Sequence, residues 1–146
     1  MPMVNVQFAT SVHIMLALAL TAKGECPKLP NSDVLAKSIH TNPVVVRRLL
    51  SMLNKAGLIK SARGKNGGVQ LNKVPAEINL KDIYVALRIE DSIKPHNKPQ
   101  KKDCAVSCSI HSIMSSITEG YQKTNLKYLE SQKLSDLIKK VKLSKI

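Results

Sequence analysis

Apolar residues recur every three or four positions along most of the chain, and short runs containing Gly and Pro separate the periodic segments. The spacing predicts a first helix over residues 6–22, a short helix that Ser32 caps, and a third helix that begins at Pro43. Two short runs, at residues 58–62 and 69–71, flank a Gly-rich turn and predict a hairpin. The expected order is therefore a helix-turn-helix followed by a small β-wing.

The third predicted helix has a strong start signal. Asn42 is expected to cap it, and Pro43 stands at the first helical position, where its fixed φ helps and its missing N–H is not needed. Four apolar residues then share one face, which we expect to be buried: Val46, Leu49, Leu50 and Leu53. The remaining residues are expected to point away from the core: Thr41, Val44, Val45, Arg47, Arg48, Ser51 and Lys55. Such a helix suits a DNA major groove, although an ordinary solvated basic face has the same pattern.

Positive charge is concentrated on the same part of the chain. The sequence has 23 Lys and Arg against 10 Asp and Glu, which gives a formal net charge of +13. No acidic residue lies between Asp33 and Glu77. Eight cations do: Lys37, Arg47, Arg48, Lys55, Lys60, Arg63, Lys65 and Lys73. This is the charge distribution expected of a protein that binds a polyanion.

The scarcity of aromatic residues narrows the choice of polyanion. Phe, Trp and Tyr make up 3% of the chain, and binding of single strands or RNA loops relies on exposed rings for base stacking. The basic helix also lacks the aromatic-rich apolar face of helices that lie on membranes. Double-stranded DNA is the favoured ligand, and a basic RNA-binding or ribosome-associated protein is the alternative.

An enzyme is not expected. The acidic residues are few and scattered, and the Gly-rich turn at residues 64–68 lacks the lysine–serine ending of a phosphate-binding loop. We predict no catalytic residue. The residues predicted to contact DNA are Thr41, Asn42, Pro43, Val45, Arg47, Arg48, Lys55, Arg63 and Lys65.

The length of 146 residues, 43% of them hydrophobic, fits one small domain with a helical extension. The expected fold is mainly α with a small β-wing. We predict a winged helix-turn-helix domain over residues 1–90, a linker over 91–103 that contains Pro95 and Pro99, and a helical dimerisation or regulatory region over 104–146. No Lys or Arg precedes the apolar stretch near the N-terminus, so we expect no signal peptide and a cytoplasmic protein.

The helix predicted after the linker carries a single apolar stripe that needs a partner. The stripe consists of Val106, Ile110, Ile113, Ile117 and Tyr121, with Met114 at its edge. A second copy of the same helix is the economical partner, because two-fold dimers usually read DNA sites, and folding back onto its own domain is the alternative. In the first helix, Ile14 and Leu18 form a second apolar face, and we expect them to join the same dimer interface.

Together these motifs closely resemble those of the Rrf2 family of winged-helix regulators, the IscR, NsrR and CymR type. The resemblance runs from about Val4 to the C-terminus and is carried by residues 41–50, the step 56–58, the glycine pattern of 63–68 and the segment 80–84. It implies a homodimeric repressor or activator whose recognition helix enters the major groove. It also implies that the wing-tip arginine, here Arg63, reaches the adjacent minor groove.

The three cysteines depart from the pattern of the cluster-binding members of that family. Those members have three nearby cysteines with five or more residues between the first two, whereas only three residues separate Cys104 from Cys108, and Cys26 is far away. We therefore expect no cofactor: an iron–sulfur cluster is not favoured, and a zinc site is a weak alternative. An odd number of cysteines without framework spacing fits reduced thiols.

Four interpretations of Cys104 and Cys108 stay open. They are incidental cysteines, a redox-sensing thiol pair, a zinc or other metal site that a further residue such as His111 completes, and a cluster. If the long helix already includes Cys104, then Cys104, Cys108 and His111 share the face opposite the apolar stripe. The thiols would then lie outside the dimer interface.

Overall fold

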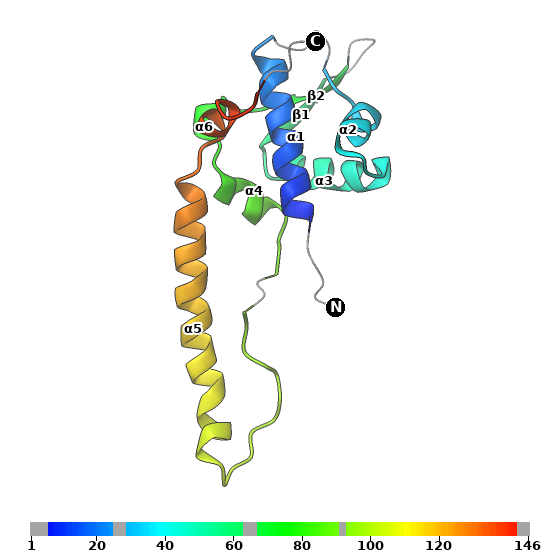
Figure 1. Ribbon diagram of the computed structural model, residues 1–146. Coiled ribbons are helices and arrows are strands. Elements are labelled where there is room, and N and C mark those ends of the chain that lie inside the picture. Colours follow the sequence, from blue (N-terminus) through cyan, green and yellow to red (C-terminus); the bar gives the residue numbers. More distant parts are fainter. Residues whose placement is uncertain (1–5, 25–28, 63–66, 91–92, 143–146) are drawn as a thin grey trace.

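The computed structural model describes residues 6–24, 29–62, 67–90 and 93–142. Within these ranges the chain forms, in order, α1 (Gln7–Ala22), α2 (Ser32–Ile39), α3 (Pro43–Lys55), β1 (Ile59–Ala62), β2 (Gly68–Leu71), a 3-10 turn η1 (Pro75–Glu77), α4 (Leu80–Ala86), α5 (Ala105–Glu130) and α6 (Leu134–Ile138). Figure 1 shows these elements gathered into one lobe, except for α5, which projects from it as a long rod. We call the lobe formed by α1–α4, the two strands and α6 the main lobe. The mainly helical fold with a two-stranded wing is the one predicted.

The core of the main lobe is built from helical stripes. The predicted stripe of α3 is buried, with no member more than 9% exposed: Val46, Leu49, Leu50 and Leu53. Ile83 of α4 and Ile78 just before that helix are fully buried in the same core. Burial of each aliphatic side chain contributes about 1.5–3 kcal/mol to stability, so the stripe fixes how α3 is rotated about its axis.

The core-facing side of α1 differs from the prediction. Ile14 and Leu18 are 0% and 1% exposed, inside the core of their own protomer, so the prediction that they form a dimer interface is wrong. Val12, Leu16 and Leu20 form the other apolar face and are only half-buried. Because α1 is apolar on most of its circumference, periodicity could not decide which side faces the core.

Side-chain caps fix where the helices of the helix-turn-helix begin. Asn42 caps α3 as predicted, with its Oδ1 accepting a hydrogen bond from the Val44 N–H at 2.9 Å. In α2 the cap is Asn31 rather than Ser32, and Asn31 Oδ1 accepts from the Val34 N–H, also at 2.9 Å. The predicted start of this helix was therefore one residue late.

The end of α3 and the start of α4 also follow local sequence signals. Gly57 has a φ of 78°, in the left-handed region where glycine is least strained, and it ends α3 as predicted. Asn79 and Asp82 form a reciprocal capping box at the start of α4. The predicted start of this helix near Asn79 is confirmed.

The two strands pair antiparallel, with Ile59 opposite Leu71 and Ala62 opposite Gly68. The Val69 N–H donates a hydrogen bond to the Pro30 carbonyl oxygen at 3.0 Å, which ties β2 to the segment before α2. At Gly68 a Cβ atom would lie 2.8 Å from the carbonyl oxygens of both Leu29 and Pro30. Only glycine allows this close approach.

The C-terminal segment packs into the main lobe. Leu134 and Ile138 of α6 are 0% and 5% exposed and share the core with Ile14 of α1. The Leu134 N–H donates to the Ile78 carbonyl oxygen at 2.8 Å. Helix α6, within the predicted region 104–146, therefore shares the hydrophobic core of the predicted domain 1–90, and α5 is the element that projects from it.

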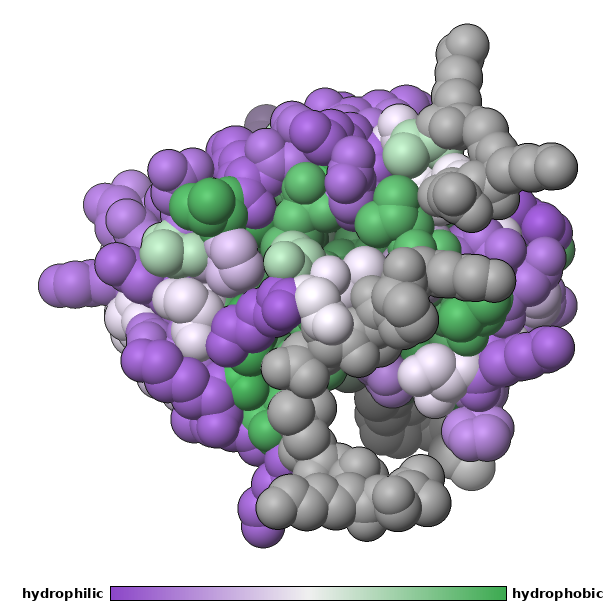
Figure 2. Space-filling view, turned by 90° about the horizontal axis from the view of Figure 1, so that it is seen from above, coloured by the Kyte–Doolittle hydropathy of each residue, from purple (hydrophilic) through white to green (hydrophobic). Residues whose placement is uncertain are grey.

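Figure 2 views the main lobe from above, and hydrophobic residues gather near the centre of this face between hydrophilic ones. Across the described residues, no helix has the length and apolar character needed to cross a bilayer.

Candidate nucleic-acid interface

The outer surface of α3 is basic and accessible. Burial of the opposite stripe leaves Arg47, Arg48, Ser51 and Lys55 exposed on the other side. Arg47 and Arg48 lie in the first half of the helix and Lys55 is its last residue. The helix therefore offers two guanidinium groups near its N-terminal end, where DNA-reading helices contact base edges, and an ammonium group at its other end.

A tight turn sets how the N-terminal end of α3 is presented. His40 ends α2 with a left-handed backbone, at a φ of 60°, and the Thr41 N–H donates to the Ala36 carbonyl oxygen at 3.0 Å. Thr41 and Pro43 are half-buried, whereas the Asn42 side chain is exposed and engaged in capping. All three residues were predicted to contact DNA, and Asn42 is the most exposed of them.

The two valines at the start of α3 have different environments. Val45 is half-buried and packs against the core, whereas Val44 is 61% exposed. Val45 therefore has less surface available for DNA than Val44, and its predicted contact with DNA stays a prediction. An exposed methyl group at this end of a recognition helix can contact the methyl of thymine.

The cations of this region are free of ion pairs within the described residues. The salt bridges found there join Lys81 to Glu130 and four further pairs after residue 89, so none involves Lys37, Arg47, Arg48, Lys55, Lys60 or Lys73. Unpaired cations keep their charge available for phosphate groups. Arg63 and Lys65, the predicted wing contacts, lie outside the described residues.

Comparison with known proteins shows to which family this chain belongs. The model of the family described as "Rrf2: Iron-dependent Transcriptional regulator" matches residues 4–140. The chain belongs to the Rrf2 family. A relative from Bacillus subtilis (strain 168), named "Putative HTH-type transcriptional regulator YwnA", is 32% identical over 137 residues, which are 93% of this chain and 97% of the relative.

Solved structures agree with the family assignment. The structure titled "T. potens IscR" is 25% identical, with a TM-score of 0.69 over 99% of this chain and 94% of that chain. The structure of CymR, titled the global cysteine regulator of B. subtilis, is also 25% identical, with a TM-score of 0.62 over 97% and 100% of the two chains. This Rrf2 protein is a DNA-binding transcription regulator, and the RNA-binding alternative has no support. The matching family and the relative from B. subtilis are both described as transcriptional regulators.

The apolar stripe of α5 is accessible in the protomer. Ile113 and Ile117 are 50% and 51% exposed, Tyr121 is 41% exposed and Val106 is 68% exposed. Ile110 and Met114 are half-buried. Helix α5 contacts α4, and linker residues Gln100 and Lys101 hydrogen-bond to Cys108 and Ser107 near its start, but these contacts leave much of the stripe exposed.

The two thiols lie at the start of α5. Cys104 is the N-cap residue, with an extended backbone, and its Sγ accepts a hydrogen bond from the Ser107 N–H at 3.4 Å. The thiol of Cys108 lies 3.5 Å from the Lys101 carbonyl oxygen. Cys104 is thus not helical, and the condition under which Cys104, Cys108 and His111 would share one helix face is not met.

An iron–sulfur cluster takes four ligands. Within the described part of the chain, no group of three or more His, Cys, Asp or Glu side chains suited to a metal ion forms. The expectation of no cofactor stays a prediction. His111 is exposed one turn beyond Cys108. Cys26 lies outside the described residues.

Proposed function

We propose that the protein is a homodimeric repressor whose two α3 helices enter successive major grooves of a double-stranded DNA operator. The observation that carries this proposal is the surface of α3, where Arg47 and Arg48 are exposed on the side opposite the buried stripe. The arginines can hydrogen-bond guanine edges, and Lys55 can contact phosphate. Arg63 remains a sequence-based candidate for a minor-groove contact.

Dimerisation is proposed through α5. A stripe that leaves Ile113 and Ile117 half exposed on a projecting helix is costly in water, and a second α5 can cover it. A two-fold dimer would hold its α3 helices about 34 Å apart, one turn of DNA, and would recognise a palindromic site. Repression is proposed because a dimer bound across a promoter blocks polymerase without any further contact surface. Since the ligand is DNA, we propose that the protein acts in the cytoplasm.

Sequencing of DNA fragments that co-purify with the protein tests the function and yields the operator. A gel shift then compares that operator with structured RNA of the same sequence, because the deep, narrow major groove of A-form RNA excludes a recognition helix. We expect a palindromic DNA site and at least about a hundredfold preference for DNA. Equal affinity for the RNA would contradict the proposal. A reporter gene behind the operator would distinguish repression from activation.

We also propose that Cys104 and Cys108 tune DNA binding by oxidation. Peroxide would take two electrons and two protons from the two thiols, forming one disulfide and two molecules of water. The supporting observation is that Cys104 Sγ caps α5 and that Cys108 follows in the first turn of the same helix. A disulfide would replace that cap and disturb the start of the helix proposed to join the protomers.

A further inference from the structure

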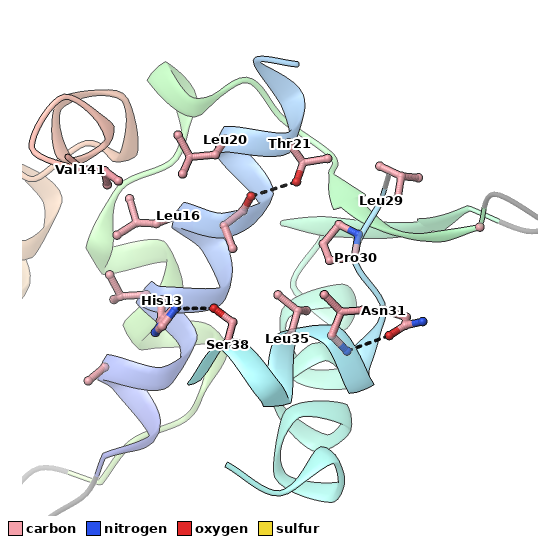
Figure 3. Close-up of a pocket in the computed structure, with 15 residues that line it drawn as sticks. His13, Leu16, Leu20, Thr21, Leu29, Pro30, Asn31, Leu35, Ser38 and Val141 are labelled. Atoms are coloured by element: carbon pink, nitrogen blue, oxygen red, sulfur yellow. Dashed lines mark hydrogen bonds between the residues drawn. The ribbon is translucent and has the colours of Figure 1, made fainter. Parts of the chain in front are cut away.

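An open groove of about 840 Å³ runs along the half-buried face of α1. Val12, Leu16 and Leu20 line one side, and Leu29 and Val34 line the other. Figure 3 shows this arrangement, with Val141 of the C-terminal segment at the far edge from α2. The volume is in the range of small-molecule sites, and none of these residues belongs to the surface proposed to bind DNA.

The groove contains one accessible polar pair. Ser38 Oγ of α2 and His13 Nε2 of α1 lie 3.4 Å apart and face each other across the groove. The other polar side chains are engaged locally, since the Thr21 hydroxyl donates to the Ala17 carbonyl oxygen and Asn31 caps α2. The described lining includes no Lys, Arg, Asp or Glu. An apolar ligand body would therefore meet few hydrogen-bonding side chains apart from this pair.

We propose that this groove binds an amphipathic monocarboxylate, such as a medium-chain fatty acid, and that its occupancy lowers the affinity for DNA. The alkyl chain would lie along the apolar walls, where each methylene group removed from water favours binding. The carboxylate would accept hydrogen bonds from the Ser38 hydroxyl and a ring N–H of His13. An anion is favoured over a cation because the chain has a formal net charge of +13.

The position of Ser38 connects the groove to DNA binding. Ser38 is in the last turn of α2, two residues before the left-handed turn at His40 that leads into α3. Leu35 and Ala36 of α2 share the core with Val46 and Leu49 of α3. A carboxylate inserted between Ser38 and His13 would move the end of α2, and the N-terminal end of α3 would move with it.

Isothermal titration of the full-length protein with sodium dodecanoate tests the binding step without DNA. We expect one molecule per protomer with micromolar affinity, and binding at least about tenfold weaker for dodecyltrimethylammonium, which has the same tail and a positive head. Ser38→Ala at the head-group position and Leu16→Gln on the wall should each weaken dodecanoate about tenfold. Val85→Gln changes an exposed valine outside the groove and should bind as the wild type does.

Two results would overturn this inference. One is dodecanoate binding that both groove variants leave unchanged while their thermal unfolding matches the wild type, which indicates nonspecific uptake. The other is binding that occurs only in a monomeric variant, which indicates that a second copy fills the groove. The effect on DNA rests on the proposed function and is measured separately, as an expected severalfold loss of operator affinity with dodecanoate. Binding without this loss would overturn the coupling while leaving the ligand site intact.

Discussion

Helices α3 and α5 are both amphipathic, but they differ in how much of the apolar side their own protomer covers. The stripe of α3 is buried, and the exposed surface of the helix is mainly polar and basic. The stripe of α5 leaves Ile113 and Ile117 half exposed. The comparison separates two kinds of contact: α3 presents charge to a charged ligand, whereas α5 presents apolar surface that a protein partner would bury. Variants of α5 and of α3 test the two kinds of contact separately.

The largest effect is expected from charge placed on the α5 stripe. The double variant Ile113→Lys, Ile117→Lys should be monomeric and should lose operator affinity by at least about a hundredfold, because two buried lysines would oppose association and a monomer binds one half-site. Light scattering measures the mass and a gel shift measures affinity. The matched control is Ser112→Lys, Ser116→Lys, which adds the same charge at exposed positions outside the stripe. If wild type is monomeric at micromolar concentration, the role of α5 is wrong.

Removal of a guanidinium group from α3 should have the next largest effect. Arg48→Ala should weaken operator binding by about 1–3 kcal/mol and relax the preference at one base position. The protein should remain dimeric and fold normally, because Arg48 is exposed. Lys127→Ala, on the exposed surface of α5, removes an equal charge away from α3 and serves as the control. If Arg48→Ala binds every operator variant with the same affinity as the wild-type protein, Arg48 is excluded from base recognition.

A smaller and less specific loss is expected at the other end of α3. Lys55→Ala should weaken binding to all DNA sequences alike and reduce the slope of log affinity against log salt by about one, since one phosphate contact is lost. Affinities for operator and random DNA, measured between low and physiological salt, provide the test. A loss confined to the operator would indicate a base contact instead.

The smallest effect should come from the thiols. Mild peroxide is expected to change wild-type operator affinity severalfold and to leave the double variant Cys104→Ser, Cys108→Ser unaffected. Cys26 is present in both proteins, so any response it causes cancels in the comparison. Equal responses would exclude this pair as the sensor. Mass measurement of the oxidised wild type should show the loss of two hydrogens when the disulfide forms.

Local signals in the sequence predicted most of the fold. Asn42 with Pro43, Gly57, and Asn79 with Asp82 act within one helical turn, so their consequences are visible in short stretches of sequence. The buried stripe of α3 was predictable for a related reason, because its polar face is unambiguous.

Long-range packing accounts for what the sequence could not predict. Both faces of α1 are apolar, and the choice of the side with Ile14 and Leu18 depends on which elements pack there. The docking of Leu134 and Ile138 into the main lobe depends on contacts with residues far away in sequence. The shared face of Cys104, Cys108 and His111 required a helical Cys104, but its own extended backbone makes it the N-cap of α5 instead. The groove beside α1 follows from the same unpredicted choice of face.

The close approach at Gly68 has a consequence for how natural variation in this protein would be interpreted. A side chain there would collide with the backbone of Leu29 and Pro30 and push the hairpin away from the main lobe. A substitution at Gly68 would then resemble loss of a DNA contact in a genetic screen, because the wing would be misplaced. The residue itself has no side chain with which to contact DNA. If Gly68 does not tolerate mutation, the reason would be the placement of the wing and not the recognition of a base.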